Sequence, residues 1–261
     1  MEPPVRRFDT NTMAIQPWII QSFQPPGQTV PIQSLPAEIP PASRWCLSRS
    51  KRAVDLLIAL AVLALLAFPM LVIAICVCLT SKGSAFFLQK RVGRGGHLFR
   101  IYKFRSMTPG SGAGPGHTRG GDQRITAFGR LLRKFKLDEL PQFYNVLRGD
   151  MSLVGPRPKL PHHEPIPDMP YRPGITGAAS LAFRHEEHIL SGVHANQLDH
   201  FYDNQIKPLK THLDLHYMSQ ATLWTDVRMM AATFLVCLAP AVDTNFLIAA
   251  EEPAGNDSMT A

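Results

Sequence analysis

A run of 24 residues without a charged side chain, Leu56 to Leu79, constrains the fold of this chain more than any other feature. A helix that spans a bilayer needs about 20 apolar residues, so this run is long enough to enter a membrane. Pro69 lies within it, and because proline lacks the N–H that continues a helix, we expect a kink there. The 13 residues from Leu56 to Phe68 cover only about 20 Å as a helix, short of the ~30 Å hydrocarbon core.

Basic residues flank both ends of this apolar run. They are Arg49, Lys51 and Arg52 before it and Lys82, Lys90, Arg91 and Arg94 after it. Because basic flanks tend to stay in the cytoplasm, both ends are expected on the cytoplasmic face. A membrane helix over residues 46–82 that enters, bends at Pro69 and returns to the same face agrees with both observations. A kinked helix that crosses the membrane once is the alternative, because proline is also tolerated in spanning helices.

The two ends of the chain differ from its centre. Residues 1–45 hold 9 of the 23 prolines and predict a disordered tail. Residues 191–261 predict two helices, over about 192–209 and 211–238, followed by a flexible end. The apolar stretch 227–250 indicates an interfacial or docking helix pair, which gives self-association as one expected role and a second membrane segment as the alternative.

The charge of the chain is concentrated in one block. Between Lys82 and Lys159 there are 16 basic and 4 acidic residues, so this block carries +12 although the whole chain carries only +7. A concentrated basic block indicates an anionic partner, which is nucleic acid, lipid head groups or a phosphorylated substrate.

The centre of the chain predicts a mixed α+β fold that is mainly helical. Two short strands, Ala85–Val92 and Leu98–Phe104, are joined by a glycine-rich turn and predict a β-hairpin. Residues 108–121 predict a mobile loop, and Ile125–Leu137 predicts a basic amphipathic helix. A second helix is expected from near Pro141 through Leu147.

After these helices, the prolines between Pro156 and Pro173 predict an extended connection outside the core. We assign residues 83–190 to one small catalytic domain packed on the membrane helix.

The sequence KLDELPQ, Lys136 to Gln142, is the strongest local chemical signal. Asp138 and Glu139 are adjacent carboxylates among cations. Such a pair can bind a divalent metal ion, or one member can attack phosphorus as a nucleophile. The alternative is an acidic pair at a helix N-terminus that only offsets the helix dipole.

Arg157 gives the second signal, because it lies between Pro156 and Pro158 in the sequence VGPRPK. The two prolines stiffen its backbone before any ligand arrives, and a preset guanidinium suits bidentate binding of phosphate. A proline-rich turn with a solvated arginine is the alternative.

Histidines and cysteines give weaker signals. His212 and His216 are four residues apart and His185 and His188 three apart, but neither pair forms an established metal motif. The four cysteines form no CxxC pair and are expected to be small apolar side chains.

Six sequence pieces, taken in order, resemble the bacterial sugar transferase family, the monotopic polyprenyl-phosphate phosphoglycosyl transferases. They lie between Lys51 and about Ile189: KRAVDLLIAL, SAFFLQKRVGRGG, FRIYKFRSM, DQRITAFGRLLRKFKLDELPQ, NVLRGDMSLVGPRP and YRPGITG. The resemblance implies a re-entrant helix broken at Pro69 in the bacterial inner membrane, with the catalytic domain on its cytoplasmic face.

The resemblance also implies a reaction. Such enzymes transfer a sugar-1-phosphate from a UDP-sugar to undecaprenyl phosphate and release UMP, as the priming step of exopolysaccharide or glycoconjugate assembly. By this likeness Asp138 is the nucleophile, Asp138 and Glu139 are the ligands of Mg²⁺, and Arg133 and Arg157 bind substrate. Lys103 and Arg105 are added to the substrate site.

The sequence departs from the family after PGITG, where AASLAFRHEEHIL replaces an aromatic-Ala-Gln pattern, so the sugar is not predicted. The competing function is a non-catalytic, membrane-anchored scaffold whose basic block binds anionic lipid or a partner protein. Nucleic acid is not an expected partner, because the aromatic residues between Phe99 and Phe104 are expected to pack in the core.

Overall fold

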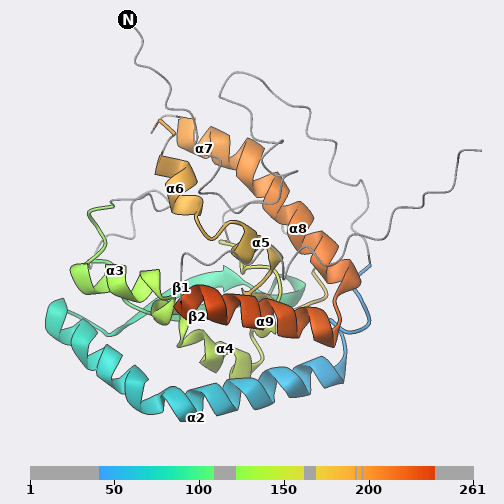
Figure 1. The fold of residues 1–261 in the computed structure, drawn as a ribbon, viewed down its shortest axis with the longest axis horizontal. Helices are drawn as coiled ribbons and strands as arrows, with labels where there is room; N and C mark the ends of the chain where they lie inside the picture. Colours follow the sequence, from blue (N-terminus) through green and yellow to red (C-terminus); the bar gives the residue numbers. More distant parts are fainter. Residues whose placement is uncertain (1–40, 109–121, 162–168, 192, 195–196, 239–261) are drawn as a thin grey trace, which may run out of the picture.

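The computed structural model describes residues 41–108, 122–161, 169–191, 193–194 and 197–238. Its elements, in order, are α2 (Arg49–Thr80), β1 (Phe86–Val92), the 3-10 turn η2 (Arg94–Gly96), β2 (Leu98–Phe104), α3 (Ala127–Lys134), the 3-10 turn η4 (Leu137–Glu139), α4 (Gln142–Arg148), β3 (Ser152–Val154), β4 (Gly174–Thr176), α5 (Ala178–Ala182), α6 (Glu186–Ser191), α7 (Leu198–Phe201), the π-helical turn η6 (Tyr202–Ile206), α8 (Lys207–Gln220) and α9 (Leu223–Leu238). The expected mainly helical fold with one antiparallel hairpin is confirmed (Figure 1).

Helix α2 is a single bent helix that lies along one side of the molecule. The Ser48 side chain caps its start by accepting a hydrogen bond from the Lys51 amide at 3.0 Å, and Pro69 lies within it. Figure 1 shows the helix as two arms at an angle, with both ends joined to the remainder of the domain on the same side. Within the described residues, it is the one helix long and apolar enough to cross a membrane. Re-entrance into one leaflet remains a prediction.

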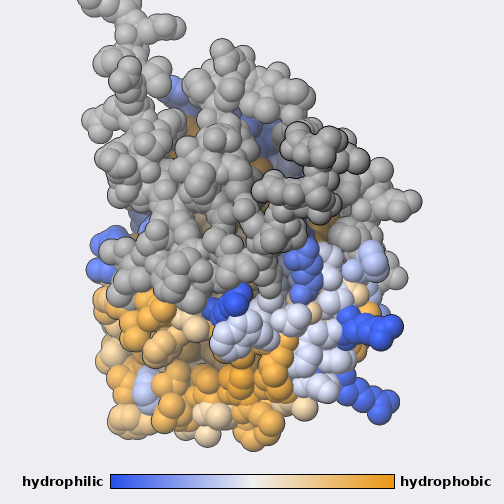
Figure 2. Space-filling model, turned by 45° about the vertical axis from the view of Figure 1, so that its right-hand side comes forward, coloured by the Kyte–Doolittle hydropathy of each residue, from blue (hydrophilic) through white to orange (hydrophobic). Residues whose placement is uncertain are grey.

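The outward surface of α2 is apolar. Leu65 and Phe68 are 78% and 74% exposed, which is unusual for such large apolar side chains in contact with water. Figure 2 shows an extensive apolar surface at the end of the molecule where Figure 1 places α2. This exposure agrees with a helix that meets lipid.

The N-terminal arm of α2 is fixed to the remainder of the described structure by polar side chains. Arg52 donates from Nη2 to the carbonyl of Val146 at 2.7 Å and so satisfies the end of α4. Asp55 accepts from the Ser152 hydroxyl at 2.8 Å and from the Leu153 amide at 3.2 Å. The main core, which includes Ala59, lies between this arm, α4, β3 and the end of α8.

The hairpin matches the predicted strands, except that β1 begins at Phe86 rather than Ala85. Its register pairs Phe87 with Lys103 and Arg91 with Phe99. Because alternate residues of a strand share a face, Arg91 and Lys103 lie on the same face of the hairpin.

Buried Asn145 joins β2 to α4. Its side chain accepts from the Tyr102 amide at 3.0 Å and donates to the Arg100 carbonyl at 2.8 Å.

The predicted helix over Ile125–Leu137 is shorter in the structure. Ile125 instead forms a bridge with Met107, and α3 begins after the capping side chain of Thr126, which accepts from the Gly129 amide at 2.9 Å. The helix ends before Lys136, whose φ of 55° is left-handed and breaks the helical path.

The proline-rich connection differs from its prediction. Pro156 and Pro158 are buried, and the connection joins β3 and β4, which form a parallel pair. A Cβ at Gly174 would lie 2.2 Å from the Gly155 nitrogen, so only glycine permits this close approach of the two backbones.

Both predicted ends also need correction. The break between the C-terminal helices lies at Ala221 and Thr222, because helical structure continues from Leu198 to Gln220. Residues 41–45 of the predicted tail are packed, and the Ser43 amide donates to the Met218 carbonyl at 2.8 Å. Residues 1–40, most of the predicted mobile loop (109–121), and residues 239–261 lie outside the described part of the chain.

Candidate active site

Asp138 and Glu139 lie in η4, which packs on the arm of α2 that follows Pro69. Their neighbours Leu137 and Leu140 pack in a cluster with Met70, Ile73 and Ala74 of α2, around buried Val77, Phe104 and Leu132. The backbone enters η4 through the left-handed Lys136, a strained conformation that is more frequent at functional sites than elsewhere. This apolar packing therefore fixes the position of the two carboxylates relative to α2.

Glu139 is a buried carboxylate held by two cations. Lys103 donates from Nζ to Oε1 at 3.0 Å, and Arg157 donates from Nη2 to both oxygens at 2.9 Å. Burial alone would raise the pKa of Glu139, but the charges of Arg157 and Lys103 outweigh it and hold that pKa far below its usual range. Glu139 is therefore ionised and serves to fix the two cations.

Asp138 differs from Glu139 because one of its carboxylate oxygens has no hydrogen-bond partner among the described residues. It is only 6% exposed, and its Oδ1 is buried without a hydrogen-bond partner in the described part of the chain. Burial raises the pKa of Asp138, repulsion from Glu139 adds to the rise, and nearby Lys103, Lys136 and Arg133 oppose it. An orphaned buried oxygen is costly, so it indicates a ligand.

Arg157 connects this carboxylate pair to the next wall of the site. Its Nε donates to the Ser180 hydroxyl of α5 at 3.0 Å. The charge of Glu139 raises the pKa of Arg157. Its side chain remains 41% exposed, so the guanidinium pairs with Glu139 and is still accessible to a ligand.

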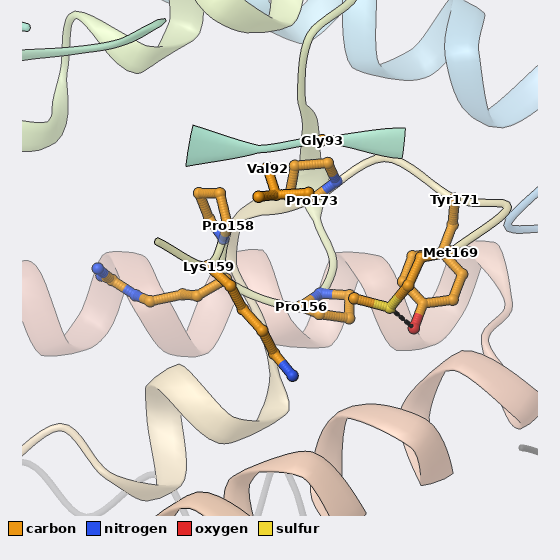
Figure 3. A pocket seen from close by; sticks show the side chains of 9 residues that line it. Val92, Gly93, Pro156, Pro158, Lys159, Met169, Tyr171 and Pro173 are labelled. Carbon is orange, nitrogen blue, oxygen red and sulfur yellow. Dashed lines mark hydrogen bonds between the residues drawn. The ribbon is translucent and has the colours of Figure 1, made fainter. Parts of the chain in front are cut away.

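A small pocket lies beside Arg157 (Figure 3). It is lined by Val92, Gly93, Pro156, Arg157, Pro158, Lys159, Met169, Tyr171 and Pro173. Three prolines give it rigid walls, and the Tyr171 hydroxyl donates to the Met169 sulfur at 2.7 Å. The pocket therefore offers a preformed surface next to Arg157, the cation that the sequence predicts to bind phosphate.

The structure thus brings together four of the predicted residues: Lys103, Asp138, Glu139 and Arg157. Arg133 reaches Asp138 through its charge.

The structure does not bring Arg105 into contact with the Asp138–Glu139 pair, so its role in the site stays a prediction. Its guanidinium donates to the carbonyls of Ser81 at 2.6 Å and Lys82 at 2.8 Å and closes the C-terminal end of α2. Its amide still donates to the Ala85 carbonyl at 2.9 Å, so the ladder of the hairpin extends to it and its side chain is held by the end of α2.

Sequence reasoning also missed two residues. Ser180 orients Arg157, and no local pattern marks it. Arg91 lies on the Lys103 face of the hairpin, and its Nη1 donates to the Pro158 carbonyl at 3.1 Å. Counting alternate residues along the two predicted strands identifies Arg91, because the register follows from the turn.

The residues present fit Mg²⁺ only as part of a substrate complex. Among the described residues there is no group of three or more His, Cys, Asp or Glu side chains able to hold a metal ion. Mg²⁺ is commonly bound by one or two carboxylates together with substrate phosphates and water. Asp138 offers its orphaned oxygen, and Glu139, whose oxygens already accept from Lys103 and Arg157, offers only its remaining lone pairs.

Comparison with known proteins identifies the family. The sequence model of the family described as "Bacterial sugar transferase" matches residues 46–240. An N-acetylgalactosaminephosphotransferase of Aeromonas hydrophila is 39% identical over 198 residues, 72% of this chain and 43% of that protein. A glucose-1-phosphate transferase of Caulobacter vibrioides is 35% identical over 203 residues, 74% of this chain and 71% of that protein.

A third relative, an undecaprenyl-phosphate glucose phosphotransferase of Komagataeibacter xylinus, is 33% identical over 230 residues, 83% of this chain and 40% of that protein. The chain therefore spans less than half the length of the Aeromonas and Komagataeibacter relatives. The match over most of the chain shows that it belongs to the bacterial sugar transferase family.

Proposed function

We propose that this chain transfers a sugar-1-phosphate from a UDP-sugar to undecaprenyl phosphate and releases UMP, as a priming step of exopolysaccharide or glycoconjugate assembly. The observation that carries the proposal is the pairing of Asp138, with an orphaned buried oxygen, and a cation cluster fixed by Glu139. The names of the relatives, which describe undecaprenyl-phosphate sugar phosphotransferases, support the same reaction.

In the first half-reaction an oxygen of Asp138 forms a bond to the phosphorus that carries the sugar. The bond from that phosphorus to the bridging oxygen breaks, and the bridging oxygen leaves with UMP. Lys103 and Arg157 lie beside Asp138 and stabilise the negative charge that builds up on the phosphate oxygens. Because Glu139 fixes both cations beforehand, little reorganisation is needed during the reaction.

In the second half-reaction a phosphate oxygen of undecaprenyl phosphate bonds to the same phosphorus. The bond to the Asp138 oxygen breaks, and the carboxylate is restored. One phosphoanhydride is exchanged for another, so the reaction needs no ATP. Mg²⁺, held by Asp138, Glu139 and phosphate oxygens, would neutralise the diphosphate and reduce its repulsion of Asp138.

The position of the site suits a lipid substrate. η4 packs through Leu137 on the arm of α2 that follows Pro69, and this arm also carries exposed apolar side chains such as Leu71 and Ile75. In a re-entrant topology this arrangement holds the carboxylates of η4 at the depth of the lipid phosphate, on the cytoplasmic face of the inner membrane. The exposed Trp224 and Phe234 of α9 support an interfacial position for that helix.

The test is UMP release by the full chain in nanodiscs, with Mg²⁺, a donor panel of UDP-sugars and undecaprenyl phosphate. UDP-glucose and UDP-N-acetylgalactosamine belong in the panel because the relatives named above use different sugars. With the acceptor omitted and the β-phosphorus labelled, we expect about one UMP per enzyme and label bound to protein. The absence of both with every donor would refute the mechanism.

A scaffold function is the competing outcome. It predicts binding to anionic membranes that falls with salt and is unaffected by Asp138→Asn, together with no UMP release.

The topology has its own test. Reporter tags at residues 40 and 110 should both report the cytoplasmic side. Tags on opposite sides would instead support a kinked helix that crosses the membrane once.

A further inference from the structure

Arg91 has cationic neighbours but no carboxylate partner among the described residues. Its Nε and Nη2 donate to the Gln89 side-chain oxygen at 3.1 and 2.6 Å, and its Nη1 donates to the Pro158 carbonyl. Both acceptors are neutral. A guanidinium has five N–H donors, so two of them remain for a ligand.

Two cations of the site, Lys103 and Arg157, bond to Glu139. Arg91 is joined to the same region by its hydrogen bond to the Pro158 carbonyl and by the bond from the Val92 amide to Lys159. The charge of Glu139 acts on Arg91, but no carboxylate of the described residues bonds to it. Arg157 therefore has a bonded carboxylate, and Arg91 has none among the described residues.

The ionisation of Arg91 agrees with this geometry. Burial and then repulsion from Arg157 lower its pKa to about 10, whereas the charges of Glu139 and Tyr202 oppose the fall, so Arg91 still carries a charge at neutral pH. Burial raises the pKa of the Tyr202 phenol in η6, the charges of Glu186 and Asp203 add to the rise, and those of Arg157 and Arg91 oppose it. A dianionic ligand between the two arginines would relieve their repulsion.

We propose that Arg91 and Arg157 form a phosphate site that is used twice in each catalytic cycle. This inference rests on the proposed function, because Arg157 bonds to Glu139, the neighbour of Asp138, and Arg91 bonds to the carbonyl of Pro158, which follows Arg157. In an in-line displacement the leaving and attacking groups lie opposite the Asp138 oxygen. The phosphate of UMP leaves from this position in the first half-reaction, and the phosphate of the lipid attacks from the same position in the second.

The experiment measures binding and needs no turnover. The full chain in nanodiscs is titrated with UMP, and undecaprenyl phosphate is then used to displace the bound UMP. The variants are Arg91→Gln and Arg91→Lys. Lys90→Gln is the matched control, because Lys90 is the adjacent basic residue on the same strand, is exposed, and points to the opposite face.

We expect undecaprenyl phosphate to compete with UMP in the wild-type chain. Loss of a charge-assisted hydrogen bond in Arg91→Gln should weaken UMP and lipid phosphate by about 10- to 100-fold each. Arg91→Lys should recover part of this loss, and Lys90→Gln should change neither affinity by more than about twofold.

A loss for only one of the two ligands, or simultaneous binding of both to the wild-type chain, would overturn the shared site. Equal affinities of Arg91→Gln and Lys90→Gln would also overturn it, provided that both variants unfold at the wild-type temperature. If the wild-type chain shows these affinities and still transfers no sugar phosphate, the proposed function fails while the phosphate site stands.

Discussion

Two buried carboxylates, Asp226 and Glu139, each bind a lysine. They differ in whether every oxygen of their cluster has a hydrogen-bond partner. Asp226 accepts from Lys51, from the Trp45 indole at 2.9 Å and from the Tyr217 hydroxyl, so both of its oxygens are satisfied with one cation. Glu139 binds two cations, and its neighbour Asp138 has an orphaned oxygen.

The difference separates a structural ion pair from a site. The Asp226 cluster joins the residues before α2 to α8 and α9, and no group in it needs an external partner. Around Glu139 the cations exceed the firmly ionised carboxylates, and a buried excess charge is stable only with a counter-ion. A substrate phosphate can supply it. Incomplete satisfaction therefore distinguishes these two clusters, which are alike in burial and in the presence of charge.

The substitution Asp138→Asn has the largest expected effect and tests whether the carboxylate with the orphaned oxygen is functional. We expect the rate of UMP release to fall by about 10⁴-fold or more, because the nucleophilic oxygen is lost. The melting temperature should stay the same or rise, since a desolvated carboxylate without a partner is replaced by a neutral amide. Parallel measurement of single-turnover rate and thermal unfolding in nanodiscs tests both. A fully active variant would show that Asp138 is not the nucleophile.

Asp226→Asn should have the opposite profile. The change leaves Lys51 buried without its counter-charge, so the free energy of unfolding should fall by about 3–5 kcal/mol. The folded fraction should keep a near wild-type turnover, because the cluster contains no proposed substrate contact. Asp199→Asn, at an exposed position of α7, is the control and should change the unfolding midpoint little. Equal effects at the two positions would contradict a structural role for Asp226.

The sequence predicts those parts of this comparison that depend on local patterns. The apolar run with Pro69 and the alternation of the hairpin place α2, β1 and β2 almost correctly, because each pattern repeats over several residues. The acidic pair Asp138 and Glu139 is predicted because two carboxylates lie among several cations in one short segment.

Contacts between distant segments leave no such local signal. Trp45 and Asp226 are separated by 181 residues, so nothing near Trp45 indicates that it belongs to the fold. The strands β3 and β4 have three residues each, too few for a periodicity. Arg105 shows the same limit, because its hydrogen bonds to the carbonyls that follow α2 are not revealed by its own segment.

Arg157→Lys sharpens the comparison within the functional cluster. Lysine keeps the charge but loses the hydrogen bond to Ser180 and the planar geometry that engages both oxygens of Glu139. We expect kcat/KM for the UDP-sugar to fall by about 10- to 100-fold with little change in melting temperature. Arg148→Lys, in the exposed pair with Asp150, should have no measurable effect. If the two substitutions behave alike, the geometry of the guanidinium is unimportant.

The smallest expected effect concerns Asp214 of α8. Its hydrogen bonding is intermediate between that of Asp226, which is satisfied, and that of Asp138, which has an orphaned oxygen. The Asp214 carboxylate accepts one long hydrogen bond, from the Ala179 amide at 3.4 Å. Burial raises its pKa to about 7, although this amide and the charges of Lys210, Lys159 and Arg157 oppose the rise. The folded chain therefore binds this proton more tightly than the unfolded chain does, in which a carboxyl group titrates near pH 4.

It follows that Asp214 makes the free energy of unfolding fall as the pH rises from about 4 to about 7, after which its contribution is constant. Asp214→Asn removes this slope, so the stability of the variant relative to wild type should increase steadily from about pH 4 to about pH 7 and then stay constant. Asp203→Asn is the control, because the Asp203 side chain is 56% exposed and should leave the pH profile unchanged. Denaturant titrations at several pH values measure both differences. Parallel profiles for the wild type and Asp214→Asn would mean that Asp214 is already ionised below neutral pH, held by the cations of the functional cluster, and would place it with Glu139 in this comparison.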